Sequence, residues 1–336
     1  MFFMKRKEDS MMKTMKTSMK CLIAMFVMTM AFAVTGITAQ AATITQTAAT
    51  KNSLTIQWEI PSSDTPTAYY VGISDKDSTS ALEQARGKAI SAGLNTSYTF
   101  NNLTPGTNYY IWVHYSYVTK SGTEYFTSVG SINNAVTLPE KVTGVKQTKW
   151  WYYLKSVDFE WDHQTAAKYE YVVKNNKGKK VHSNTTSSRK GSCSKSINNN
   201  MLYTVKVRAY VSYNNQNYYG DWSDGAYLFT QPMVNKNKSS LSSGKLKISW
   251  DKINGVTGYD VYVSTKEKTG YKKVKSVSKS KNSVTITKLK GKKINKNKKY
   301  FVYIVAKKKV GKTTYTSGKH YTYEMKNKKL NWTFDK

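Results

Sequence analysis

Apolar and polar residues alternate over long stretches of this sequence, and two alternating runs return three times in the same order. One run has the form apolar-x-apolar-x-Trp, and the other, roughly 40 to 50 residues later, has the form Tyr-x-apolar-x-apolar. The first runs span residues 54–58, 157–161 and 246–250, and the second span 109–113, 203–207 and 300–304. Period-two alternation is typical of strands with one buried face. The repetition therefore predicts three copies of one small β domain.

A third alternating run begins 8 to 11 residues after each tryptophan, at Tyr69, Tyr169 and Tyr259. Turn-forming residues lie between the runs, as in the pair Asn254-Gly255. Short strands separated by turns, with aromatic and β-branched residues at alternating positions, indicate a β-sandwich. We expect an all-β chain, with a turn or two of helix only between residues 81 and 90.

The lead-in to the first tyrosine run carries a family signature, and it reads Leu103-x-Pro105-x-Thr107-x-Tyr109-x-Ile111-x-Val113. It resembles the fibronectin type III family, in which the tyrosine hydroxyl bonds back to the chain at a corner of the sandwich. The tryptophan runs match the same family, and residues 219–224 resemble the start of its last strand. The second copy has residues 197–201 in place of the Leu-x-Pro-x-Thr lead-in, and the third has residues 291–299 in place of the usual turn.

This resemblance covers nearly all of the chain after its first 41 residues. It implies three tandem immunoglobulin-like β-sandwiches of seven strands each, used as spacers or recognition modules. Such modules are frequent in secreted and surface proteins of bacteria and animals. The resemblance implies no chemistry, so function has to be argued from particular residues.

The chain begins with a segment that has the features of a signal peptide. Lysines and an arginine precede an apolar run at residues 22–34, and Ala39-Gln40-Ala41 supplies small residues at the cleavage spacing. The apolar run is too short to span a membrane, so we expect export without a transmembrane anchor. The predicted divisions are a signal peptide at residues 1–41 and three domains at residues 42–138, 139–232 and 233–336. The protein should be secreted, and extracellular or associated with the cell surface.

Candidate catalytic groups are scattered. The four histidines, His114, His163, His182 and His320, show no metal-binding spacing. We expect His114 to face outward, on the side of its strand opposite Val113. Cys193 is the one cysteine left after cleavage, so no internal disulfide is expected, and no histidine is near it in the sequence. We therefore expect no catalytic residues, no metal site, no cofactor and no enzymatic activity.

A carboxylate follows the tryptophan of each copy, at Glu59, Asp162 and Asp251. A pair of acids can serve glycoside hydrolysis. These three lie one to a domain in equivalent positions, so they cannot meet in one cleft.

Positive charge accumulates toward the C-terminus. Residues 42–138 hold 5 basic and 6 acidic groups, residues 139–232 hold 14 and 7, and residues 233–336 hold 28 and 5. All basic residues of the third domain are lysines. Their compact charges suit repeated anionic groups better than the sequence-specific recognition of DNA bases. We expect this domain to bind a polyanion, such as an anionic cell-wall polymer of the teichoic acid type, through Lys288, Lys290, Lys292, Lys293, Lys296, Lys298, Lys299, Lys307, Lys308, Lys309 and Lys312.

Two groups of lysines, before and after the Tyr300 strand, are expected to line one edge of the third domain. Extracellular nucleic acid is another polyanion that fits the same charge. A solvated face that only keeps the protein soluble is the competing interpretation.

Four consecutive aromatic residues form the second candidate surface: Trp150, Trp151, Tyr152 and Tyr153. A period-two strand cannot bury all four, so some should be exposed and could stack on a glycan. A position in the core or at a domain interface is the competing interpretation. The alternatives for the whole chain are a carbohydrate-binding accessory protein and an adhesin whose first domain contacts a host protein. We expect a monomer.

Overall fold

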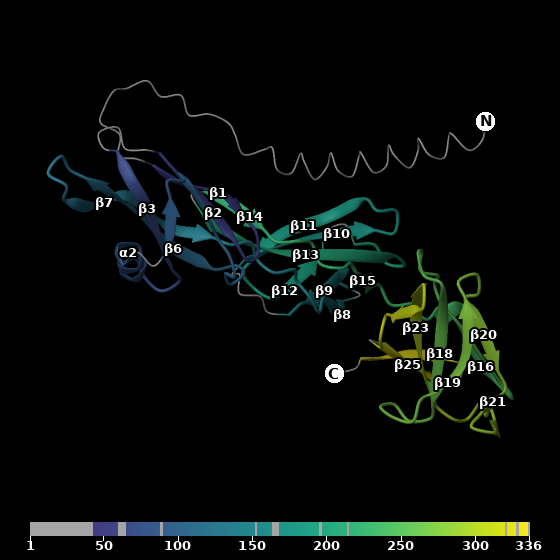
Figure 1. The fold of residues 1–336 in the computed structure, drawn as a ribbon. Helices are drawn as coiled ribbons and strands as arrows, with labels where there is room; N and C mark the ends of the chain where they lie inside the picture. Colours follow the sequence, from purple (N-terminus) through teal and green to yellow (C-terminus); the bar gives the residue numbers. More distant parts are fainter. Residues whose placement is uncertain are drawn as a thin grey trace, which may run out of the picture. The chain divides into compact units, whose positions relative to one another are not determined.

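The computed structural model describes residues 43–59, 65–87, 90–151, 153–162, 168–194, 197–213, 215–319 and 321–326, and the backbone alone of residues 329–334 (Figure 1). The predicted signal peptide, Tyr152, His163 and His320 lie outside the described residues. The chain divides into two compact units: one holds most of the first predicted domain, up to residue 103 and from 108 to 135, and the other holds residues 104–107 and 136–336, which include the second and third domains.

Two sheets make up the first domain, with strand orders β1-β2-β5 and β4-β3-β6-β7. Leu54, Ile56, Ile111 and Val113 occupy the inward positions of the predicted runs and are fully buried. The strands are β1 (Ile44–Ala49), β2 (Leu54–Trp58), β3 (Pro66–Ser74), β4 (Ser91–Gly93), β5 (Ser97–Phe100), β6 (Asn108–Val118) and β7 (Glu124–Val136).

The same arrangement returns in the second domain, with sheets β12-β9-β8 and β11-β10-β13-β14 and with β15 also paired to β13. Tyr203 forms the expected corner, because its hydroxyl accepts a hydrogen bond of 2.7 Å from the backbone N–H of Asn198. The strands are β8 (Lys146–Trp151), β9 (Ser156–Glu160), β10 (Lys168–Asn175), β11 (Lys180–Thr186), β12 (Lys190–Cys193), β13 (Leu202–Tyr213), β14 (Gln216–Tyr219) and β15 (Ala226–Phe229).

In the third domain the sheets are β16-β17-β20 and β19-β18-β23-β25-β26, with β24 also paired to β23 and with β21 and β22 forming a small hairpin. The hydroxyl of Tyr300 accepts a bond of 2.9 Å from the backbone N–H of Asn295, which makes a second corner. The elements are η1 (Lys236–Lys238), β16 (Ser240–Ser242), β17 (Lys245–Ser249), β18 (Gly258–Ser264), β19 (Lys272–Ser278), β20 (Ser283–Ile286), β21 (Lys288–Leu289), β22 (Lys292–Lys293), β23 (Tyr300–Val310), β24 (Thr313–Thr316), β25 (Tyr321–Lys326) and β26 (Lys329–Phe334).

A helix, α2 (Ser78–Arg86), interrupts the first domain close to the predicted position, but it begins three residues earlier and ends four residues earlier. Its first turn is capped by the Asp77 carboxylate, which accepts a bond of 2.7 Å from the backbone N–H of Ser80. The helix lies against β3 and β6. A Cβ on Gly72 of β3 would stand 2.0 Å from the backbone oxygen of Ala81, so only glycine permits this close packing.

The expectation that His114 faces solvent is wrong. The side chain does leave β6 on the side opposite Val113, but it is buried, with 3% of its surface exposed. Helix α2, which comes from a segment about 30 residues earlier, packs over that face of the sheet. Burial lowers the pKa of His114, and the positive charge of Arg86 on the helix lowers it further.

Residues of the second and third domains belong to one continuous hydrophobic core. The hydroxyl of Tyr321 on β25 donates a bond of 3.2 Å to the backbone oxygen of Trp150 on β8. Gln231 Nε2, at the end of the second domain, donates a bond of 3.2 Å to the backbone oxygen of Tyr321. Tyr321, a buried residue of the third domain, therefore also contacts the second domain.

Backbone hydrogen bonds cross the same boundary. The N–H of Leu202 donates to the oxygen of Asn254 at 3.0 Å, and the N–H of Asn254 donates to the oxygen of Asn200 at 2.9 Å. Gly255 has a φ of +95°, and a Cβ there would lie 3.1 Å from the Cβ of Leu202. The two backbones come this close because residue 255 carries no side chain.

Candidate functional site

The first group of predicted lysines lies on the β21–β22 hairpin of the third domain, which Figure 1 shows at one end of that domain, and on the segment that connects this hairpin to β23. Buried Leu289 and Ile294 anchor the hairpin, and the lysines between them are exposed. Its two-residue turn holds Lys290 at a φ of 50° and Gly291 at a φ of 77°. A lysine in this left-handed conformation is unfavourable, since glycine and asparagine are preferred there.

Lys288 of β21 pairs directly with Lys293 of β22. Like charges opposite each other destabilise an antiparallel pair. Within the described parts of the chain, none of the following exposed lysines forms an ion pair: Lys288, Lys290, Lys292, Lys293, Lys296 and Lys298. Lys299 differs, because its Nζ lies 3.2 Å from Glu324 Oε1. The hairpin is therefore a surface of accumulated positive charge that is not balanced locally.

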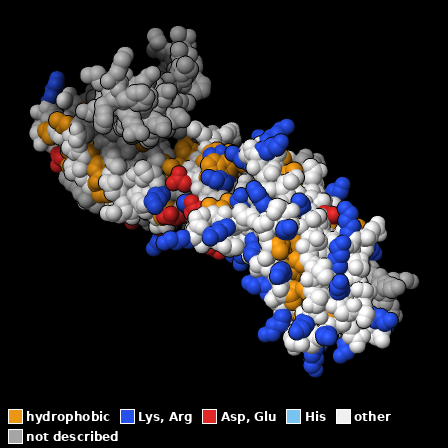
Figure 2. All heavy atoms as spheres, turned by 90° about the vertical axis from the view of Figure 1, so that its right-hand side faces the viewer, with side chains coloured by type: hydrophobic (Ala, Val, Ile, Leu, Met, Phe, Trp, Pro, Cys, Tyr) orange, Lys and Arg blue, Asp and Glu red, His pale blue; other side chains and the backbone are white. Residues whose placement is uncertain are grey.

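Lysines cover much of the visible face of the third domain, at the lower right of Figure 2, and acidic side chains are sparse there. The cause lies in the composition, since this domain has five acidic residues and Asp260 is buried. Surface lysines therefore outnumber the carboxylates that they could pair with.

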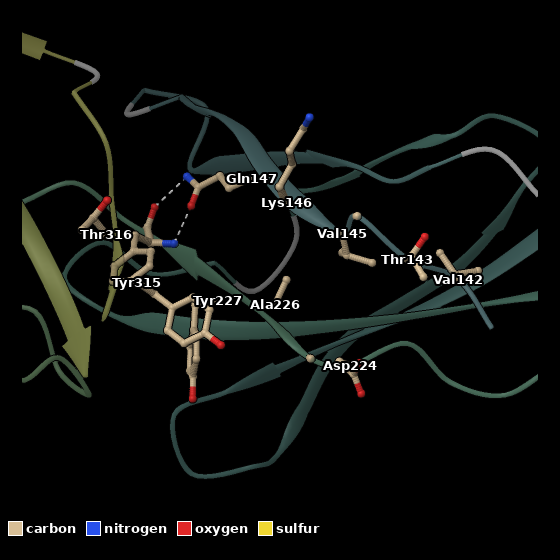
Figure 3. Close-up of a pocket in the computed structure, with 13 residues that line it drawn as sticks. Val142, Thr143, Val145, Lys146, Gln147, Asp224, Ala226, Tyr227, Tyr315 and Thr316 are labelled. Atoms are coloured by element: carbon tan, nitrogen blue, oxygen red, sulfur yellow. Dashed lines mark hydrogen bonds between the residues drawn. The ribbon is translucent and has the colours of Figure 1, made fainter. Parts of the chain in front are cut away.

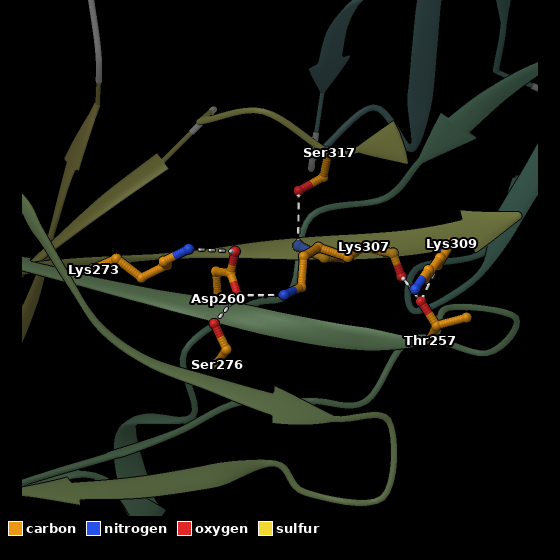
Figure 4. Close-up of polar contacts among 8 residues, drawn as sticks. Thr257, Asp260, Lys273, Ser276, Lys307, Lys309 and Ser317 are labelled. Atoms are coloured by element: carbon orange, nitrogen blue, oxygen red, sulfur yellow. Dashed lines mark hydrogen bonds and ion pairs between the residues drawn. The ribbon is translucent and has the colours of Figure 1, made fainter. Parts of the chain in front are cut away.

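The second group of predicted lysines is partly used inside the third domain. Asp260 on β18 receives Lys307 Nζ at 2.5 Å and the Ser276 hydroxyl at 2.6 Å, and Lys273 Nζ lies 3.7 Å away (Figure 4). Burial raises the pKa of Asp260, but the bonds from Lys307 and Ser276 and the two lysine charges outweigh it and hold that pKa below its ordinary value. Lys308 Nζ donates to the backbone oxygen of Gly255 at 3.0 Å.

The expectation that both lysine groups line one edge is also wrong. Lys299 immediately precedes β23, whereas Lys307 to Lys309 lie near its other end. At about 3.3 Å per residue, the eight residues from Lys299 to Lys307 span about 26 Å. The strand is longer than the family pattern alone indicated, so the hairpin lysines and the second group occupy opposite ends of the sheet.

The aromatic run of the second domain is divided between core and surface. Trp150 is 1% exposed, so it cannot offer a ring face to a glycan, and for this residue the core interpretation holds. The neighbouring Trp151 is 37% exposed, and Tyr153 is 72% exposed. Trp151 Nε1 donates to Asp158 Oδ2 at 2.6 Å, and Lys149 Nζ lies 3.5 Å from the centroid of the Trp151 ring. Alternation in β8 puts Trp150 and Trp151 on opposite faces, and Tyr153 follows the end of that strand.

The remaining chemical groups do not converge. Cys193 is buried, which raises the pKa of its thiol to about 11 and keeps it protonated. Asp162 accepts a bond of 3.0 Å from the Thr143 hydroxyl. Among the described residues, no group of three or more His, Cys, Asp or Glu side chains is placed to hold a metal ion. No helix in the described ranges is long and apolar enough to cross a membrane.

Sequence reasoning missed two adjoining hollows that share Gly225 and Tyr227. Their other lining residues lie far apart in the sequence, between residues 142 and 316, and only strand pairing brings them together. Of these residues, the sequence marked only Trp222 and Asp224, as part of the segment 219–224 that resembles a family strand.

The fibronectin type III domain family model matches residues 39–136. Among solved structures, the chain is similar to the FN1–FN3 domains of chicken CNTN1, with 15% sequence identity, 85% of this chain and 97% of that chain covered, and a TM-score of 0.28. No curated protein matches the sequence.

The first domain is thus a fibronectin type III domain, and such domains are typically non-catalytic. The second and third domains repeat its paired sheets and its tryptophan and tyrosine runs. The predicted all-β fold is confirmed, and the likeness of the rest of the chain to this domain consists in those repeated sheets and runs.

Proposed function

We propose that the protein is an exported, non-catalytic surface protein that binds an anionic cell-wall polymer through the β21–β22 hairpin of its third domain. The polymer is of the teichoic acid type, with phosphates repeated along a flexible chain. The other domains act as a spacer or adhesion module. Lys307 and Lys308 contribute little to this binding, since both are engaged within the domain.

The observation that carries the proposal is the pairing of Lys288 with Lys293 next to Lys290 in a left-handed turn. Both features are unfavourable for the isolated hairpin. A bound polyanion would relieve the repulsion and would use the exposed ammonium groups together. A face that only promotes solubility needs lysines, but it does not need them opposed on one hairpin.

The binding mode follows from the residue type. Lysine ammonium groups are mobile point charges, so each contact with a phosphate is weak and the contacts are many. An exposed ion pair contributes roughly 0.5 kcal/mol, so four of them change affinity by a factor of about 30. Binding should also weaken steeply as NaCl rises, because salt screens exposed charges.

The experiment is co-sedimentation of the full chain with purified bacterial cell walls, intact or stripped of anionic polymer. The test variant is Lys288→Gln/Lys290→Gln/Lys292→Gln/Lys293→Gln, and its matched control removes four other exposed lysines of the same domain, in Lys245→Gln/Lys247→Gln/Lys279→Gln/Lys281→Gln. The test variant should lose about 30-fold in affinity, while the control should lose far less. Equal losses in both, or unchanged binding to stripped walls, would refute a specific role for the hairpin.

A second candidate function, adhesion through the first domain, is favoured by its exposed aromatic side chains. Tyr125 is 50% exposed and Phe126 is 37% exposed, both on β7, and the Tyr125 ring stacks on Tyr117 at 5.9 Å. The domain is nearly neutral, with 5 basic and 6 acidic residues. Apolar contact with a protein partner would therefore bind in a salt-insensitive way. Tyr125→Ser should abolish cell adhesion without changing wall binding if this function exists, and unchanged adhesion would exclude this surface.

A further inference from the structure

The second domain has a hollow of about 500 Å³ on the outer face of its β10–β13 sheet. We propose that this hollow binds an anionic sugar unit, that is, a pyranose carrying a carboxylate or phosphate, within a linear polysaccharide. Val172 and Thr204 form the floor, Trp222 and Tyr227 form aromatic walls, and Lys174 and Lys206 supply positive charge. The volume lies in the range of ordinary ligand sites.

Strand register builds this arrangement. Lys174 on β10 pairs with Thr204 on β13, and Thr204 pairs on its other side with Tyr227 on β15. One row of side chains therefore crosses three strands on the same face. In the next row of that face, Val172 pairs with Lys206. The two lysines and the tyrosine thus lie around Val172 and Thr204 because of the pairing, although they come from three separate strands.

Trp222 is held in place before any ligand arrives. The guanidinium carbon of Arg208 lies 4.5 Å from the Trp222 ring centroid and 3.6 Å from that of Tyr219. Glu170 fixes the same guanidinium group, because its Oε2 lies 2.6 Å from Arg208 Nη2 and 2.7 Å from Arg208 Nε. An aromatic wall that is positioned in advance loses little freedom when a ligand binds.

The charge of the hollow indicates an anion. Lys174 and Lys206 are exposed, and neither forms an ion pair with a described residue. Asp224, a nearby carboxylate, is bound by Lys141 Nζ at 2.7 Å; this hydrogen bond, the Lys141 charge and, least, the Lys206 charge lower the pKa of Asp224. Two lysines without an ion-pair partner therefore line a space that two aromatic side chains also line. The apolar C–H faces of a sugar ring suit the walls, and an acidic substituent suits the lysines.

A sugar fits better than a nucleotide. Adenine and cytosine are recognised at their edges chiefly by Asn, Gln, Asp or Glu side chains, and none of these four residue types lines this hollow in the described structure. The hydroxyl of Thr204 on the floor is a donor and an acceptor, which suits a sugar hydroxyl.

A second hollow of about 410 Å³ lies beside the first, and Gly225 and Tyr227 line both (Figure 3). Tyr315 of the third domain stands beside Tyr227 there, with ring centroids 4.8 Å apart. Gln147 closes the edge of β15 by exchanging two hydrogen bonds with the Phe229 backbone, at 2.7 and 3.0 Å. The two hollows together have room for more than one sugar ring, so an oligosaccharide should bind more tightly than a monosaccharide.

A substitution at Gly225 can fill the site without removing either of its two lysines. A Cβ at this position would have Lys206 Cε as its nearest neighbour, at 3.7 Å, which is ordinary contact. Gly225→Leu should therefore fold normally and fill the hollow. Gly225→Ala adds one methyl group and is the matched control.

The experiment is calorimetric titration of the full chain with trigalacturonate and with glucose 6-phosphate, which separate carboxylate from phosphate recognition. Maltotriose, inorganic phosphate and adenosine 5′-monophosphate are the comparison ligands. Trigalacturonate or glucose 6-phosphate should bind at least tenfold more tightly than maltotriose and inorganic phosphate. Gly225→Leu and Lys174→Gln/Lys206→Gln should each weaken that binding at least tenfold, while Gly225→Ala and Lys155→Gln/Lys190→Gln, which removes two exposed lysines outside the hollow, should not.

Three results would overturn the proposal: no binding of either acidic sugar, binding unchanged in Lys174→Gln/Lys206→Gln, or tighter binding of the nucleotide. The thermal midpoint of each variant checks its folding. This site uses no residue of the β21–β22 hairpin, so the four-lysine hairpin variant should bind the acidic sugars as the parent does. Failure of the wall-binding proposal would therefore leave this one intact.

Discussion

The joint between the second and third domains gives the sharpest prediction about stability. Replacing Tyr321 with alanine removes a buried ring from the shared core and the hydroxyl bond to Trp150. Truncating a buried aromatic side chain costs about 3 to 5 kcal/mol. Tyr321→Phe keeps the ring and loses one hydrogen bond, which costs about 1 kcal/mol. Separation of the two domains should become easier by these amounts.

Amide hydrogen exchange measures this separation directly. The N–H groups of Leu202 and Asn254 are bonded across the joint, so they exchange when the domains part even if each domain stays folded. Tyr321→Ala should lower their protection at least about 100-fold, and Tyr321→Phe about fivefold. Val205 and Val261, inside the two sandwiches, serve as internal controls. Equal loss of protection at all four amides would mean that Tyr321→Ala unfolds whole domains, which would refute the role given to the joint.

Three further predictions concern single buried positions. The pKa of His114 is lowered in the folded state, so the unfolded chain binds the extra proton below about pH 6.5. The free energy of unfolding of the first domain should therefore fall between pH 7 and pH 5 in urea titrations, and His114→Leu should flatten that dependence; parallel curves would contradict it. Gly72→Ala should destabilise the same domain by about 2 to 3 kcal/mol, because α2 has to move, and an unchanged urea midpoint would argue against the close packing. Asp260→Asn leaves Lys307 and Lys273 without their carboxylate and should lower the thermal midpoint of the third domain. A higher midpoint would show that the desolvation penalty of the buried carboxylate exceeds the free energy of its interactions with the two lysines.

Regular alternation made most of the fold predictable. Residues such as Ile56 and Val205 are buried because every second residue of a strand points to the same face of the sheet. This alternation can be read from a few consecutive residues. The corners at Tyr203 and Tyr300 were predictable for a similar reason, since each hydroxyl reaches a backbone only five residues away.

Features that depend on distant segments were not predictable. Alternation put His114 on the correct side of its strand, but it contained no information on the helix that covers that side. Lys174 and Lys206 meet through the pairing of β10 with β13, Trp222 joins them from the segment between β14 and β15, and no short motif contains all three. The lysine hairpin was visible from its charge, whereas the like-charge pairing of Lys288 with Lys293 required the structure.

Strand β19 lies at the edge of the larger sheet in the third domain, and it carries Lys272, Lys273 and Lys275. An open sheet edge can be extended by a strand from another molecule, which is how many β proteins begin to aggregate. Bringing two such edges together would place lysines against lysines. Copies crowded on one surface would therefore stay separate molecules instead of growing into fibrils.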